Sequence, residues 1–424
     1  MTANWEIETL ENGLRVVTTP VPTAQSVSVN VFVGVGSRAE EPRTNGLSHY
    51  IEHMMFKGTE RRKTSIDIAE AIEGAGGVLN AYTSQEVTCY WNQVPFDKLS
   101  LAMDVLADMM QHSVIAQEEV DRERTVVQQE IRRAYDQPGA WASRLLSEAS
   151  FGDQQLGWPV AGTVETVEEM NRDDFMDHIA TWYVPKNTVL SVAGNTTHKA
   201  VVEEARKLFG EQTGGEPPPI EPAKEGRPEH YIIVEARDIT QSNLGMSMRA
   251  VSRTDPDRYP VTILNAVLGR GMSSRLFKEV RERRGLAYSI GSGVTRYNDT
   301  GVMSISAGVT AEHVSETTQV IKAELRKLID ELVGEAELTK ARDYTTGSFR
   351  LSLETPMALA QRTGELLLLL GEIEPIDDVV DKLTAVTSED VQRVAQRLFR
   401  DDNLSMSLVG PGADEDELAK ALAA

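Results

Sequence analysis

Apolar and polar residues alternate with two different periods along this chain, and the periods predict a mixture of strands and helices. Valines at every second position from 27 to 33 are typical of a half-buried strand, and Asn12-Gly13 predicts the turn of a hairpin over residues 8–18. Apolar residues at intervals of three and four predict helices. In the first half, strands are expected at 26–35, 78–83, 87–94 and 187–194, and helices at 46–58, 65–73, 99–110, 118–135, 172–182 and up to 208.

The order of elements in the first half recurs in the second. Residues 210–228 are rich in Gly, Pro and Glu, which is typical of a linker. Beyond them, Asn-Leu-Ser-Met-Ser-Leu-Val-Gly at 403–410 echoes Asn-Thr-Val-Leu-Ser-Val-Ala-Gly at 187–194, and a helix follows each. We therefore predict an α+β protein of two similar halves, each an antiparallel sheet packed against helices. The expected boundaries are 1–212 for the N-terminal domain, 213–229 for the linker and 230–424 for the C-terminal domain.

Composition excludes several classes of protein. With 41% hydrophobic and 25% charged residues among 424, the chain resembles soluble globular proteins of two domains. The longest aliphatic run, 366–370, is far too short to span a bilayer, and residues 1–6 show no secretory or organellar signal. The single cysteine, Cys89, fits a reducing compartment. We therefore expect a cytoplasmic protein without membrane association.

The net charge of −22 argues against nucleic acid as a partner, because affinity for nucleic acid rests on Lys and Arg. The excess of acidic residues could steer basic peptides towards the protein. The simpler interpretation is a solvated surface that keeps the protein soluble.

Two of the seven histidines stand in the sequence His49-Tyr-Ile-Glu52-His53. On a helix, residues four apart lie on one face, so both imidazoles can bind one metal ion. A catalytic zinc ion usually takes three protein ligands and leaves a fourth position for water. Glu123 and Glu130, two turns apart on a predicted helix, share an apolar face and are both candidates for the third ligand. A buried carboxylate needs a partner, and a dication would serve.

Glu52 stands beside a ligand but has a different predicted role. Directed at the open metal position, its carboxylate can take a proton from water and pass it to the leaving amine of a cleaved peptide. The alternative is that Glu52 forms only a salt bridge on the helix surface. The other five histidines lack such neighbours and are expected to be surface or core residues: His112, His178, His198, His230 and His313.

The set of His49, Glu52, His53 and Glu130 resembles the insulinase/pitrilysin family of zinc peptidases, the inverzincins. Within that family the resemblance is greatest to bacterial and mitochondrial-processing-type subunits of similar length, and it covers nearly the whole chain. It implies one zinc ion per chain, held by His49, His53 and Glu130, with Glu52 as the base. It also implies that Glu123 contacts the zinc ligands without binding the ion itself.

Two further segments carry the resemblance. Residues 76–84 resemble the family segment after the active-site helices, which implies that Asn80 and Ala81 lie on an edge strand where substrate pairs as an added strand. Residues 273–288 resemble the segment whose Arg and Tyr reach across to the zinc site, here Arg281 and Tyr288. A guanidinium and a phenol suit holding substrate carbonyls and stabilising a developing oxyanion.

One departure from the family pattern affects the expected substrate. In mitochondrial processing subunits, acids ten and fourteen residues beyond the zinc glutamate help to read arginine in the substrate. Those positions here are Ala140 and Arg144. The difference argues against arginine-directed presequence cleavage and favours a broader peptide preference.

We therefore predict a zinc metalloendopeptidase that hydrolyses peptides or unfolded segments held in an enclosed chamber. One zinc-bearing half and one Arg/Tyr half need a second such pair to close a chamber, so we expect a homodimer, with a heterodimer as the variant. The rival prediction is a non-catalytic or weakly active assembly subunit of a peptidase-like complex. Such subunits typically lose the histidines or Glu52, and this chain retains them. A zinc enzyme acting on something other than peptides is a further alternative.

Overall fold

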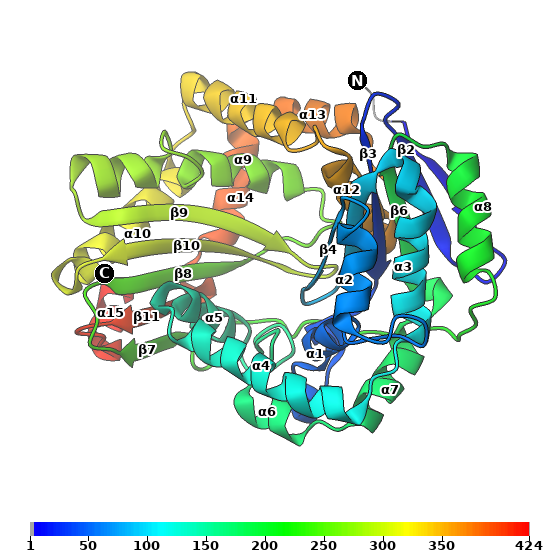
Figure 1. The fold of residues 1–424 in the computed structure, drawn as a ribbon. Helices are drawn as coiled ribbons and strands as arrows, with labels where there is room; N and C mark the ends of the chain where they lie inside the picture. The colour runs from blue at the N-terminus through cyan, green and yellow to red at the C-terminus, as the bar shows by residue number, and fades with distance from the viewer. Residues whose placement is uncertain (1–3, 424) are drawn as a thin grey trace. The chain divides into compact units, whose positions relative to one another are not determined.

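The computed structural model describes residues 4–423, so residues 1–3 of the N-terminal stretch discussed above lie outside it. The described chain folds into two compact units, and each unit is assembled from three separate segments (Figure 1). Unit 1 comprises the described residues up to Ile131, Pro159–Glu221 and Arg350–Ile376, and unit 2 comprises Arg132–Trp158, Pro222–Phe349 and the described residues from Asp377 onward.

Unit 1 is built on a six-stranded sheet in the order β1-β2-β6-β3-β5-β4. The central strands β3 and β6 are buried along nearly their whole length. β6 runs parallel to β2, whereas the other neighbouring strands are antiparallel. The strands are β1 (Glu6–Thr9), β2 (Arg15–Pro20), β3 (Ser26–Val33), β4 (Val78–Thr83), β5 (Thr88–Pro95) and β6 (Thr188–Gly194).

Separate apolar clusters pack against the two faces of this sheet, because successive side chains of a strand point to opposite faces. The alternating valines of β3 enter the larger core with residues of α1, α2 and α3. Phe32 of β3 instead packs against Leu367 of α12. The helices of unit 1 are α1 (Leu47–Met54), α2 (Ser65–Glu73), α3 (Leu99–His112), most of α4 (Gln117–Tyr135), α6 (Val164–Glu169), α7 (Arg172–Trp182), α8 (His198–Phe209) and α12 (Pro356–Leu370), with short turns at Ser37–Ala39, Pro42–Thr44, Phe96–Lys98 and Pro185–Asn187.

Unit 2 repeats this plan with a five-stranded sheet in the order β7-β11-β8-β10-β9. Its one parallel pair, β7 and β11, matches the pair β2 and β6 of unit 1. The strands are β7 (Ile232–Ala236), β8 (Ser242–Ala250), β9 (Ala287–Arg296), β10 (Gly301–Val309) and β11 (Leu404–Gly410). The helices are α5 (Pro138–Phe151), α9 (Arg258–Leu268), η5 (Phe277–Arg283, a π-helix), α10 (Val314–Asp330), α11 (Glu335–Leu351), α13 (Ile376–Ala385), α14 (Ser388–Leu398) and α15 (Glu415–Ala423), with turns at Ala311–His313 and Asp401–Asn403.

One helix from each half of the sequence belongs to the unit built mainly from the other half. α5 packs on β8 and β11 of unit 2, and α12 packs on β2, β3 and β6 of unit 1. In each unit, a serine of the sheet makes a hydrogen bond to the backbone of the helix. Ser191 of β6 donates to the carbonyl of Ala360 on α12 (2.7 Å), and Ser407 of β11 donates to the carbonyl of Ala142 on α5 (2.8 Å). The compact units therefore divide the chain differently from the expected boundaries at 212 and 230.

The predicted α+β class and the two similar halves are confirmed, and most expected elements are present. The sheets are mixed rather than antiparallel, because β6 and β11 return after long helical connections and enter beside a strand of the same direction. The prediction that the strand with alternating valines is half buried is wrong, because α12 covers its second face. α5, α6 and α10 to α14 were not predicted. Among the described residues, no helix is both long and apolar enough to cross a membrane.

Candidate metal centre and active site

α1 carries the predicted His-x-x-Glu-His sequence and begins at an unusual backbone position. Its N-cap, Gly46, has φ +102°, and a Cβ there would lie 2.6 Å from the carbonyl oxygen of Ala161, so only glycine fits. No side chain caps the helix at this residue. Instead, the buried carboxylate of Glu40 accepts the N–H groups of Gly46 and Ser48, each at 2.7 Å. These two hydrogen bonds satisfy backbone donors at the N-terminus and fix where α1 starts.

The inner face of α1 packs into the core of unit 1, which leaves the site residues on the other face. Tyr50 and Met54 are fully buried, and the Tyr50 hydroxyl donates to the carbonyl of Val120 on α4. The side chains of His49 and His53 are 13% and 19% exposed, and their rings lie 4.7 Å apart between centroids. α1 and α4 are thus tied together beside the two imidazoles.

Glu130 of α4 completes a cluster with the two histidines. Its carboxylate oxygens lie 3.8 Å from Nε2 of His49 and 3.5 Å from Nε2 of His53, and one ligand atom from each residue falls within 4.8 Å of the others. No other three His, Cys, Asp or Glu side chains converge in this way within residues 4–423. The Glu130 side chain is 52% exposed, so the predicted burial of its helix face does not extend this far along α4.

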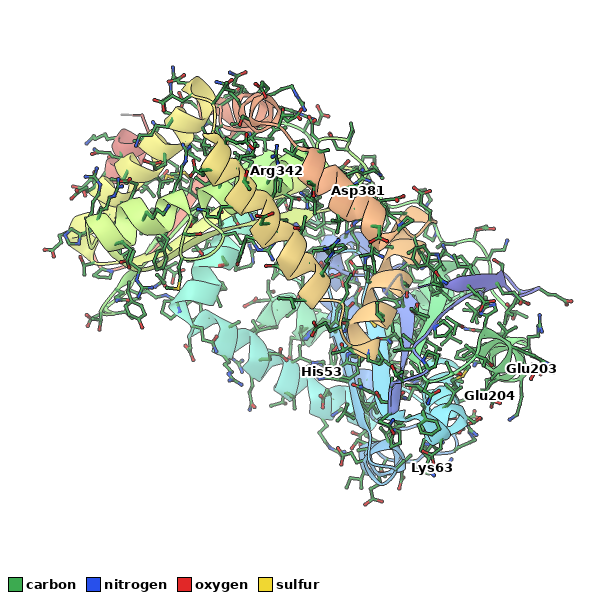
Figure 2. The ribbon with its side chains drawn as sticks, turned by 90° about the horizontal axis from the view of Figure 1, so that it is seen from above. His53, Lys63, Glu203, Glu204, Arg342 and Asp381 are labelled. Atoms are coloured by element: carbon green, nitrogen blue, oxygen red, sulfur yellow. The ribbon has the colours of Figure 1, made fainter. Side chains whose placement is uncertain are left out.

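Glu123, the other predicted acid, stands behind the cluster rather than in it. Nδ1 of His53, the histidine labelled in Figure 2, donates to Glu123 at 2.9 Å, and Lys57 pairs with the second carboxylate oxygen at 2.6 Å. The side chain of Glu123 is only 7% exposed. Because Nδ1 of His53 is engaged, Nε2 remains for a metal ion, an arrangement typical of metal-binding histidines.

The electrostatics of the cluster favour a positive charge at its centre. Burial lowers the pKa of His53, but hydrogen bonds and negative charge from Glu123 and Glu130 outweigh burial and raise this pKa to about 9. Burial and the charge of His53 lower the pKa of His49 to about 4. The acids thus attract one cation, while His49 stays neutral and able to donate its lone pair.

The donor set fits a zinc ion. Two imidazole nitrogens and one carboxylate are ligands that catalytic zinc sites use, and a fourth position is left open. His49, His53 and Glu130 supply this set, and Glu123 orients one of the imidazoles. The residues present would therefore hold zinc without rearrangement of the fold.

Glu52 lies one residue before His53 on α1, and its carboxylate is held by β4. Thr83 at the end of β4 donates to Oε2 of Glu52 at 2.5 Å. Burial raises the pKa of Glu52, and the hydrogen bond from Thr83 partly opposes this increase. β4 is an edge strand that pairs with β5. Asn80 on β4 is exposed, and its side-chain oxygen accepts the N–H of Ala81 at 2.8 Å.

The predicted Arg/Tyr pair belongs to unit 2. Arg281 lies in the π-helix η5, a rare conformation, and its guanidinium carbon lies 4.8 Å from the ring centre of Phe277 and 5.5 Å from that of Tyr288. Tyr288 is 75% exposed at the start of β9. Arg144 is also in unit 2, on α5, where it donates to the carbonyl of Gly157 at 3.0 Å.

Comparison with known proteins identifies the family. Residues 15–164 match the family model described as insulinase (peptidase family M16), and residues 169–344 match the peptidase M16 inactive domain. An uncharacterized zinc protease of Bacillus subtilis is 36% identical over 412 residues, which cover 96% of this chain and 98% of the relative. The chain belongs to peptidase family M16.

Further relatives extend this M16 assignment. An uncharacterized zinc protease of Streptomyces coelicolor is 36% identical over 96% of this chain and 90% of the relative. A protease of Helicobacter pylori shares the fold with a TM-score of 0.89 at 24% identity, over 97% of this chain and 100% of that one. A chain in a structure of Complex III2 from Candida albicans has a TM-score of 0.85 at 21% identity, over 98% of this chain and 99% of that one. The last two similarities concern the fold alone.

Three residues of this M16 site were not singled out from the sequence. Glu40 accepts hydrogen bonds at the start of α1, Lys57 pairs with Glu123, and Thr83 donates to Glu52. Lys57 follows His53 by four residues, so helical spacing could have placed both beside one acid. No spacing rule connects Thr83 with Glu52 or Glu40 with Gly46, because these contacts form only when a strand or turn packs against α1.

Proposed function

We propose that this M16 chain is a zinc-dependent endopeptidase that hydrolyses peptides or unfolded segments. The observation that carries the proposal is the convergence of the ligand atoms of His49, His53 and Glu130 within 4.8 Å of one another. Glu52 lies on α1, the helix that carries both histidines. The relatives named as zinc proteases, at 36% identity over nearly the whole chain, support the same assignment.

The residues of the site have distinct tasks in this proposal. His49, His53 and Glu130 hold the metal ion, and Glu123 keeps the ring of His53 in place. When bound, zinc acidifies a water molecule and polarises a carbonyl oxygen. Glu52 accepts the proton of the attacking water and delivers it to the leaving amine nitrogen. Its raised pKa suits this exchange, because a weakly basic carboxylate would hold the proton too briefly.

Substrate binding is assigned to main-chain pairing and to a carbonyl-binding pair. We propose that an extended peptide adds to the free edge of β4 at Asn80 and Ala81, where backbone hydrogen bonds give affinity with little demand on side chains. Arg281 and Tyr288 hold substrate carbonyl oxygens. Arg144, at a position where an acid would favour arginine, is consistent with a broad peptide preference.

The active assembly in this proposal is a homodimer, with a heterodimer as the variant, and its location is cytoplasmic. A strict monomer that cleaves peptides at full rate, measured by light scattering during turnover, would refute the assembly. Fractionation of cells that express the tagged chain tests the location.

Metal analysis combined with Glu52→Gln tests the catalytic proposal. We expect about one zinc ion per chain in both proteins, and loss of peptide cleavage only in the variant. Removal of zinc by a chelator should abolish cleavage by the unaltered protein, and added zinc should restore it. An active Glu52→Gln protein would refute the role of Glu52 and with it the mechanism.

The second candidate is a non-catalytic or weakly active subunit of a larger complex. A chain in Complex III2 from Candida albicans shares the fold, so the fold itself is compatible with membership of a larger complex. Zinc bound at His49 and His53 without cleavage of any member of a mixed peptide library would support it.

A further inference from the structure

The strand proposed to pair with substrate also holds the proposed base. Thr83 is the last residue of β4 and follows Asn80 by three positions and Ala81 by two. Its hydroxyl donates to Oε2 of Glu52 at 2.5 Å, and both side chains are half-buried. Within the described residues, this is the one hydrogen bond that the Glu52 carboxylate makes.

A base that acts on water needs one oxygen held at a defined place. A glutamate side chain has several rotatable bonds, and its last torsion is broad rather than fixed. The hydroxyl of Thr83 occupies Oε2, so Oε1 is left free to face the reacting water. A hydrogen bond to a charged acceptor is short and roughly twice as strong as a neutral one, which is enough to select one orientation.

We propose that Thr83 is a positioning residue for Glu52, which holds the carboxylate in the orientation that accepts the proton. The proposal rests on the peptidase function proposed above and adds to it a link between strand and base. A peptide that pairs with β4 contacts the same short strand that orients Glu52. The position of β4 therefore determines both where the peptide pairs and how the carboxylate of Glu52 is oriented.

A purely structural role is the alternative, and Thr88 provides the matched control. Thr88 on β5 is the cross-strand partner of Thr83. Its hydroxyl also makes a hydrogen bond, to the carbonyl oxygen of Val35 at 2.9 Å, and it is fully buried. Thr88→Val thus removes a hydroxyl from the same strand pair without removing the bond to Glu52.

The kinetic test compares Thr83→Val, Thr83→Ser and Thr88→Val. Valine has the shape of threonine without the donor, so we expect kcat to fall about tenfold to a hundredfold, part of the effect of a general base. KM and the zinc content should stay within twofold. Serine keeps the donor and should restore kcat to within about threefold, and Thr88→Val should leave kcat within twofold.

A second readout does not depend on activity. In zinc-free protein, Thr83→Val should lower the melting temperature by about 2–4 °C, as expected for loss of one hydrogen bond in a domain of this size. In the background of Glu52→Ala, the same substitution should cause no such shift, because the acceptor is gone. Equal shifts in both backgrounds would show that the hydroxyl acts on something other than Glu52 and would overturn the proposal.

The kinetic outcomes separate this proposal from the general function. If Glu52→Gln is inactive while Thr83→Val keeps full kcat, the role of Thr83 is refuted and the peptidase function stands. If Glu52→Gln cleaves peptides normally, Glu52 is not the base, and the mechanism and the role of Thr83 both fail. If the unaltered protein with zinc bound cleaves no peptide, the peptidase function itself fails. If Thr83→Ser loses as much kcat as Thr83→Val, the methyl group and not the hydroxyl is required, which also refutes the positioning role.

Discussion

Gly364 in the middle of α12 is expected to be a position where alanine, normally the better helix former, destabilises the protein. Gly→Ala within a helix stabilises by about 1 kcal/mol when nothing interferes. At Gly364, however, a Cβ would lie 2.3 Å from Cε2 of Phe32 and 2.7 Å from Cβ of Ser191. Separations this short do not occur between real side chains, so α12 or the sheet must move.

The magnitude follows from the surroundings. Phe32 and Ser191 are fully buried in the sheet, so neither can move aside into solvent. Overpacking of such a site costs typically about 1–3 kcal/mol and sometimes more. With contacts this short we take the upper end, about 3 kcal/mol, which leaves a net loss of about 2 kcal/mol after the gain in helix propensity. For a domain of this size, the loss lowers the melting temperature by about 4–8 °C.

Gly347 of α11 is the matched control, because it also lies in a helix and a Cβ there would meet nothing within 4 Å. Gly347→Ala should raise the melting temperature, while Gly364→Ala should lower it. Thermal and urea unfolding of both variants measures the difference. Phe32→Leu in the Gly364→Ala background should recover part of the loss. If Gly364→Ala stabilises as much as Gly347→Ala, α12 does not pack on this sheet as described.

Three further predictions concern zinc, acid and the exchange of helices. Glu123→Gln should weaken zinc binding about tenfold to a hundredfold without abolishing it, as measured by competition with a chelator, since it acts through His53. Burial lowers the pKa of His178 to about 4, so the unfolded chain binds its proton first as the pH falls. About 3 kcal/mol of stability should therefore be lost between pH 6.5 and 4, and urea titrations should show a smaller loss in His178→Asn. Residues 1–212 expressed alone should fail to unfold cooperatively, because α12 is missing, and should gain structure when a peptide of residues 350–376 is added.

Helical spacing allowed the site on α1 and α4 to be predicted, but not which of the two acids on α4 lies beside both histidines. Glu123 and Glu130 lie two turns apart, and both spacing and composition leave them equivalent. The packing of α4 against α1 distinguishes them: Glu130 lies beside both Nε2 atoms, while Glu123 contacts Nδ1 of His53 and Lys57. That packing depends on tertiary contacts, such as the hydrogen bond from the Tyr50 hydroxyl of α1 to the carbonyl of Val120 on α4, which a local pattern does not contain.

The strand β3 shows a second limit of local patterns. Its valines alternate with Ser28, Asn30 and Phe32, which predicts one polar, solvated face. In the structure α12 covers that face, and two of its polar groups find donors or acceptors there: Ser28 donates to the sulfur of Met357, and Asn30 donates to Ser28. The side-chain oxygen of Asn30 is buried without a hydrogen-bond partner within residues 4–423. Polar residues on a strand therefore did not indicate water here. They indicated a second buried layer whose helix lies more than three hundred residues further along the chain.

The exchange of α5 and α12 has a consequence for how the duplicated chain can work. The sheet that supports α1 has one face covered by helices from its own half and the other covered by α12. Without α12, the cluster around Phe32 would be exposed to water, and burial of such apolar surface is what stabilises a domain. The zinc-bearing unit is therefore incomplete without sequence from the second half. A protein cut between its halves can keep the site only if the second half still supplies α12 to the sheet beneath it.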